Sequence, residues 1–96
     1  MKLLSVQASD KATKKFMAKF ETDAGRSKTV HFGAAGMDDY TKTKDKEQRE
    51  RYRTRHKKDL ETGDPSKAGF LSYYLLWGDS TSLQTNLAAY KKRFNL

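Results

Sequence analysis

The sequence has no cysteine, a single proline and no long run of apolar residues. Without cysteine there is no disulfide bond, no thiolate ligand for zinc and no cysteine nucleophile. The apolar runs all fall short of the roughly 20 residues that a membrane-spanning helix needs, and the one near the N-terminus is too short for a secretory signal. We therefore expect no membrane partner and an intracellular protein, or one packaged inside a particle.

Side chains that commonly carry catalysis or bind metals are also scarce. The two histidines, His31 and His56, lie far apart in the sequence and predict no metal centre. The segment GAAG at residues 33–36 is not followed by the Lys-Ser/Thr pair of a phosphate-binding loop. Asp38 and Asp39 lack a third ligand, so we interpret them as capping residues. Because no Ser/His/Asp or paired-carboxylate arrangement stands out, we predict a non-enzymatic protein with no metal and no cofactor.

What the chain does contain is charge and aromatic rings. Charged residues make up 33% of the sequence and hydrophobic residues only 35%, a composition close to that of partly disordered chains. However, five Phe, five Tyr and one Trp are a strong reason to expect a packed core. A chain of 96 residues has room for one modest core, so we predict a single domain over residues 1–96.

The first third of the sequence alternates between apolar and polar residues, as β-strands do. Three such runs are separated by turn segments at residues 9–13 and 22–26, which predicts an antiparallel meander over residues 1–33. Its apolar face is expected to carry Leu4, Val6, Phe16, Phe20, Val30 and Phe32. Its polar face is expected to carry Lys15, Lys19 and a solvated His31.

After a linking loop at residues 34–43, the pattern becomes helical. Residues 44–60 are dominated by Glu, Lys, Arg and Gln and contain neither Gly nor Pro, which favours a helix. Its apolar stripe is thin, with Tyr52, His56 and Leu60 spaced four residues apart. Such a stripe can lean on a core but cannot build one.

Residues 64–95 predict an apolar helical hairpin. Phe70 and Trp77 belong to a helix that is apolar almost all round and should be buried, with Asp64 as its cap and Gly78 at its end. Ser80 or Ser82 should cap the last helix. The predicted fold is therefore α+β, a three-stranded antiparallel β-meander followed by three α-helices.

Positive charge is concentrated in one segment. The net charge is +8, and residues 42–60 carry nine basic and four acidic side chains. On a helical wheel Arg51, Arg55 and Lys58 fall opposite the apolar stripe, in a row suited to phosphates. The candidate nucleic-acid-binding residues are Arg49, Arg51, Arg53, Arg55, Lys57, Lys58, Lys15, Lys19, Lys91, Lys92 and Arg93.

Simpler interpretations remain open for each of these features. Acidic residues are interleaved in the basic helix, and Glu47 with Arg51 would make an ordinary i,i+4 ion pair. The rings around Trp77 are interpreted as core rather than as a platform for bases. The last two helices are interpreted as a packing hairpin, because only Gln84 and Asn86 could read bases.

Three segments resemble a family of small basic proteins encoded by large DNA viruses of algae and protists: "FGAAGMDDYT", "RHKKD" and "AGFLSYYLLWG". The sequence is also similar to related nucleoproteins shared by such viruses and dinoflagellates, over about Lys28 to Phe94. The resemblance implies DNA binding and compaction, in a virion, a host nucleus or a viral factory. Dinoflagellate nucleoproteins usually add a long Lys-rich tail, which this sequence lacks, so we expect DNA binding without strong condensation. The family's basic element corresponds to Arg51, Tyr52, Arg55, His56, Lys57 and Lys58.

Two functions from different classes follow from the sequence. The first is non-enzymatic binding of nucleic acid, DNA rather than RNA, through phosphate contacts that are largely independent of base sequence. The alternative is a protein-interaction or virion-structural module whose basic helix binds an acidic partner. Assembly with copies of itself stays open in both cases.

Overall fold

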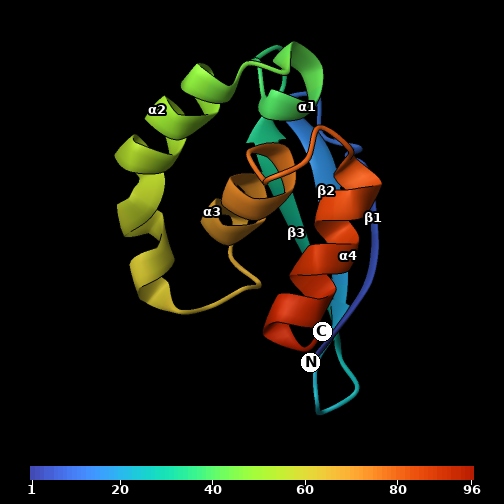
Figure 1. Ribbon diagram of the computed structural model, residues 1–96. Helices are drawn as coiled ribbons and strands as arrows, with labels where there is room; N and C mark the ends of the chain where they lie inside the picture. Colours follow the sequence, from blue (N-terminus) through green and yellow to red (C-terminus); the bar gives the residue numbers. More distant parts are fainter.

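Three antiparallel strands form one sheet in the order β1-β2-β3, with helices packed on one of its faces (Figure 1). The computed structural model describes residues 1–96. The strands are β1 (Lys2–Ala8), β2 (Lys14–Glu21) and β3 (Ser27–Ala34). This confirms the predicted α+β class and the three-stranded meander.

The helical part is more broken than predicted. It contains α1 (Tyr40–Thr43), α2 (Lys46–His56), the 3₁₀ segment η1 (Lys57–Thr62), α3 (Ala68–Leu71), the π-helical turn η2 (Ser72–Leu76) and α4 (Leu83–Phe94). The predicted loop at residues 34–43 therefore contains a one-turn helix. Asp39 caps this helix by accepting a hydrogen bond from the Thr41 amide at 2.9 Å, which confirms a capping role for Asp39.

The apolar face of the sheet differs from the prediction at one position. Leu3 is 3% exposed and Leu4 is 55% exposed, so assigning Leu4 to the core was wrong. The pairing register shifts between Leu3 and Ser5, where a bulge inserts one residue into β1. An extra residue reverses the inward and outward alternation on one side of the bulge, which strict period-two reasoning does not detect.

The core lies between the sheet and the segment formed by α3, η2 and α4. Phe20 and Phe32 from the sheet are fully buried, as are Leu71 and Leu75 from the helical side. Trp77 is 6% exposed and buried as predicted. Phe70 is buried too, and its ring contacts the Phe94 ring of α4, with the centroids 5.7 Å apart.

The caps of the helical hairpin differ in part from the prediction. Asp64 does not cap α3; its carboxylate accepts hydrogen bonds from the amide and hydroxyl of Ser66, two residues on, and so stabilises a turn. Ser82 caps α4 by accepting from the Thr85 amide at 3.2 Å. Gly78 is needed for close packing, because a Cβ there would lie 2.2 Å from the backbone oxygen of Tyr74.

The connection between η2 and α4 is locked by a buried amide. Asn86 is 5% exposed. Its side-chain nitrogen donates to the carbonyls of Leu75 and Ser80, and its oxygen accepts from the Ser80 amide at 3.0 Å. These contacts support the interpretation of this region as a packing hairpin, because the Asn86 amide is fully used inside the protein.

Candidate nucleic-acid interface

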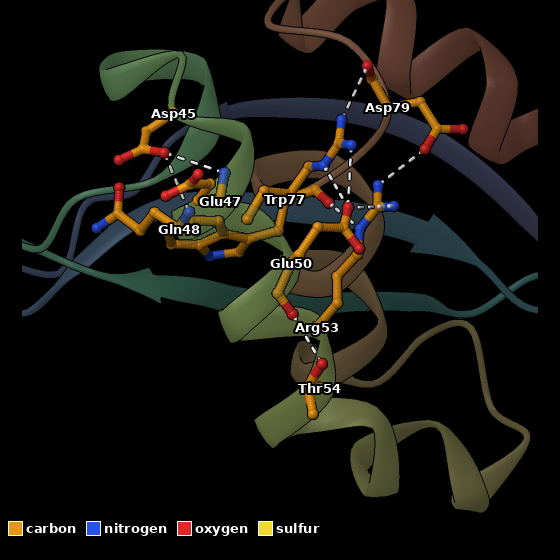
Figure 2. Close-up of polar contacts among 9 residues, drawn as sticks. Asp45, Glu47, Gln48, Glu50, Arg53, Thr54, Trp77 and Asp79 are labelled. Carbon is orange, nitrogen blue, oxygen red and sulfur yellow. Dashed lines mark hydrogen bonds and ion pairs between the residues drawn. The ribbon is translucent and has the colours of Figure 1, made fainter.

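Helix α2 begins two residues later than predicted because Asp45 is its cap. The Asp45 carboxylate accepts hydrogen bonds from the amides of Glu47 and Gln48 at 3.0 and 3.1 Å (Figure 2). The helix ends at His56 and continues as the 3₁₀ segment η1. Basic residues gather in the last turn of α2, where the helix dipole favours cations.

The apolar stripe of α2 turns toward the protein, as predicted. The Tyr52 ring stacks on Trp77 with centroids 4.4 Å apart and on His56 at 4.1 Å. Burial raises the pKa of the Tyr52 phenol to about 12, and the nearby Asp59 carboxylate adds to the increase. His56 accordingly lies at the edge of the core, with its side chain 40% exposed and its Nδ1 3.0 Å from Asp59 Oδ2.

Arg53, a predicted phosphate ligand, is instead engaged inside the protein. Its Nε donates to the backbone oxygen of Trp77 at 2.8 Å, and a terminal nitrogen donates to Asp79 Oδ1 at 2.9 Å (Figure 2). The same guanidinium approaches Glu50 at 3.7 Å, and the side chain is only 20% exposed. The hydrogen bond from Arg53 lowers the pKa of the Asp79 carboxyl.

Arg49 is engaged in the same way, one turn earlier. Its Nε donates to Glu50 at 3.0 Å and a terminal nitrogen reaches the Asp79 carbonyl at 3.4 Å. The guanidinium lies 4.7 Å from the centroid of the Tyr40 ring, a cation–π distance. Arg49 and Arg53 therefore attach α2 to the segment after η2, and their charges are largely used within the protein.

Four neighbouring basic side chains in the second half of α2 and in η1 are free, as is Lys46 in the first turn of α2. Arg51, Arg55, Lys57 and Lys58 are exposed, and none of them forms a hydrogen bond or ion pair within the chain. The predicted ion pair between Glu47 and Arg51 does not form. We call these four residues the basic row; they extend from α2 into η1.

The structure does not gather the remaining candidates on the same surface. Lys15 forms an ion pair with the buried Asp39 at 2.6 Å and is only 13% exposed. Lys19 is exposed on the sheet face that points away from the helices, because it alternates with the buried Ala18 and Phe20. The three cations of α4 are also exposed; they are Lys91, Lys92 and Arg93.

One further polar cluster was not expected from the sequence. Ser9 Oγ lies 2.7 Å from His31 Nδ1, and the Asp10 carboxylate lies 3.9 Å from the other ring nitrogen. The His31 side chain is 16% exposed, so the prediction that it is solvated was wrong. Since Ser9 Oγ also accepts from the Lys11 amide at 3.0 Å and Asp10 is 78% exposed, this cluster stabilises the β1–β2 turn.

The structure also contains a cleft of about 540 Å³ beside α2, which we did not predict from the sequence. Its walls come from four separate segments: α2 with η1, the start of β2, the end of β3 with the loop after it, and α3 with η2. Tyr52, Arg55 and His56 line one side. The glycines of GAAG were a signal in the sequence, but which segments meet there depends on the tertiary fold.

Comparisons with known proteins give one match. A family model fits residues 4–56, more than half of the chain. The protein belongs to the family of unknown function DUF5754. Neither the curated proteins nor the solved structures include a match.

The region shared with DUF5754 runs from β1 to the last residue of α2. It includes Arg51 and Arg55 of the basic row and ends before Lys57 and Lys58. Within the structure, no helix has the length and apolar character needed to cross a membrane. No group of three or more His, Asp or Glu side chains lies close enough together to hold a metal ion.

Replacing Arg53 with Ala should destabilise the fold. The variant loses two charge-assisted hydrogen bonds, at Trp77 and Asp79, and the expected loss in unfolding free energy is about 1.5–3 kcal/mol. Urea denaturation measures it. Arg51→Ala is the matched control, since Arg51 has no partner in the chain, and should change stability by less than about 0.5 kcal/mol. Equal losses in the two variants would contradict the structural role of Arg53.

Proposed function

We propose that this protein binds nucleic acid without catalysing a reaction, and that it contacts phosphates through the basic row, with DNA as the expected polymer. The observation that supports the proposal is that some basic side chains of α2 and η1 bind within the protein and others do not. Arg49 and Arg53 are used inside the protein, whereas the four residues of the basic row have no partner in the chain. Side chains that contribute no contact to the fold are available for a ligand.

The length of the basic row suits a nucleic-acid backbone. From Arg51 to Lys58 the helical segment spans about 10 Å. Duplex DNA presents about six phosphate charges over that length of its axis. Arginine binds phosphate oxygens in pairs through its planar guanidinium group, and lysine acts as a point charge. Such contacts fix the position of the backbone but carry no information about base sequence.

The wider charge of the chain and its resemblance to viral and dinoflagellate nucleoproteins support the same proposal. A net charge of +8 would attract a polyanion over a distance that shortens as salt is added. A phosphate-binding role would bring the protein to a genome, in a virion, a host nucleus or a viral factory. The alternative is an acidic protein partner for the same basic row.

A salt titration of the wild-type chain tests the proposal. Binding to duplex DNA should weaken linearly in log affinity against log salt, with a slope of about −4 to −5 for four to six phosphate contacts. Two duplexes of equal length and unrelated sequence should bind with the same affinity within a few fold. Fluorescence anisotropy of a labelled duplex is a suitable measurement. Failure to bind either duplex at low salt, together with binding to polyglutamate, would reject DNA and favour the acidic protein partner.

A further inference from the structure

The cleft beside α2 has small residues on the wall formed by β3 and the loop after it, next to the longer side chains of Lys15 and Met37. Gly33, Ala34 and Gly36 lie on that wall, and a Cβ added at Gly36 would meet nothing within 4 Å. The cleft volume of about 540 Å³ falls in the range of ligand pockets, roughly 300–1,000 Å³. The opening is therefore large enough to admit a flat heterocyclic ring.

The opposite wall presents the end of an aromatic stack. Trp77, Tyr52 and His56 form three stacked rings, and all three line the cleft. Trp77 at one end of the stack is buried, whereas the His56 side chain at the other end is 40% exposed. A fourth planar ring placed on His56 would continue the stack into the cleft.

Charge connects the cleft to the basic row. Arg55 belongs to the basic row and also lines the cleft, and Lys14 lines it from the strand side. Two carboxylates also line the cleft: Asp59, whose Oδ2 lies 3.0 Å from His56 Nδ1, and the exposed Asp38. A strand lying along the basic row would therefore pass the mouth of the cleft with cations on both sides of the opening.

We propose that the cleft receives one unpaired nucleobase of a single-stranded nucleic acid, stacked on His56, while the flanking phosphates contact Arg55 and Lys14. The inference rests on the proposed function and identifies its preferred substrate as a strand with unpaired bases. Bases inside a duplex are paired and stacked on their neighbours, so they do not enter. Because every base has a π-face, stacking is compatible with binding that is independent of sequence.

The wild-type chain tests this without any mutation. Its affinities for an oligothymidylate and for an abasic strand of the same length are measured by anisotropy at one salt concentration. The two strands carry the same phosphates and differ only in their bases. The oligothymidylate should bind between about 5-fold and 150-fold tighter, the range expected for one stacked base. Equal affinities would overturn the cleft proposal and leave phosphate binding intact, whereas no binding to either strand would overturn both.

A variant that fills the cleft tests whether the preference for the oligothymidylate over the abasic strand arises there. Ala34 is exposed and lines the cleft, so Ala34→Trp should occupy the opening while every charge is retained. The preference for oligothymidylate should fall to nearly one, with affinity for the abasic strand unchanged. Ala24→Trp, in the exposed turn between β2 and β3, is the matched control and should keep the wild-type preference. A full preference in Ala34→Trp would place the base contact elsewhere and overturn the proposal.

Discussion

Replacing Trp77 with Ala should lower the unfolding free energy by about 3–5 kcal/mol, the usual cost of emptying a large buried aromatic site. Trp77 is 6% exposed, and its indole packs against the Tyr52 ring with only 10° between the planes. Urea denaturation of the full chain measures the loss. Trp77→Phe keeps an aromatic ring for Tyr52 to stack on, so its loss should be clearly smaller.

Trp77→Ala should also destabilise α2 locally more than it destabilises the sheet. In Trp77→Ala, Tyr52 of α2 loses the indole on which it stacks, whereas Arg53 keeps its hydrogen bond to the backbone oxygen of residue 77. Amide hydrogen exchange should therefore accelerate in α2 before it does in β2, where the strands pair on both sides. A variant with wild-type stability, or with uniform acceleration in both elements, would show that Trp77 does not hold α2 in place.

The parts of the fold that the sequence predicted are those governed by local rules. Period-two alternation identified the three strands, and the apolar segment around Phe70 identified the buried helix. The misassignment of Leu4 came from a bulge, which depends on how β1 pairs with β2 and leaves no trace in the alternation of β1 alone. Gly78 follows the end of η2, as predicted, but the reason for a glycine there is its close contact with the Tyr74 carbonyl and Asn86.

The candidate site could be predicted only for side chains that point away from the protein. The helical wheel placed Arg51 and Arg55 outward, and both are exposed. The same wheel placed Arg53 beside the apolar stripe, but it could not show that Arg53 is engaged inside the protein, because the partners of Arg53 lie 24 and 26 residues further along the chain. Lys15 is similar, since its partner Asp39 comes from a different element. Long-range pairing decides which charges are free, and a wheel contains no information about it.

Replacing Arg51, Arg55 and Lys58 together with Ala should weaken DNA binding if these side chains contact phosphates, and should leave it unchanged if they are only solvated. Each phosphate that is no longer neutralised reduces the magnitude of the salt slope on duplex DNA by about 0.9, so the triple Ala variant should have a slope flatter by up to about three units. At 0.1 M salt its affinity should fall by about two to three orders of magnitude. The decrease should be similar for unrelated sequences, because phosphates carry no base identity.

The control for this variant removes the same charge from elsewhere. Lys2, Lys11 and Arg26 are exposed, and their side chains form no hydrogen bond or ion pair in the chain. Changing these three residues to Ala gives the control the same net charge as the basic-row variant. Any difference in salt slope between the two variants therefore depends on where the removed charges lie, and not on total charge. The fold of both should survive, since none of the six side chains packs in the core, and circular dichroism with urea denaturation checks this. Two outcomes would contradict phosphate binding by the basic row: wild-type affinity and slope in the basic-row variant, or an equal loss of affinity in the control variant. The basic row would then be a solvated surface, and an acidic protein partner would explain the positive charge of the chain better.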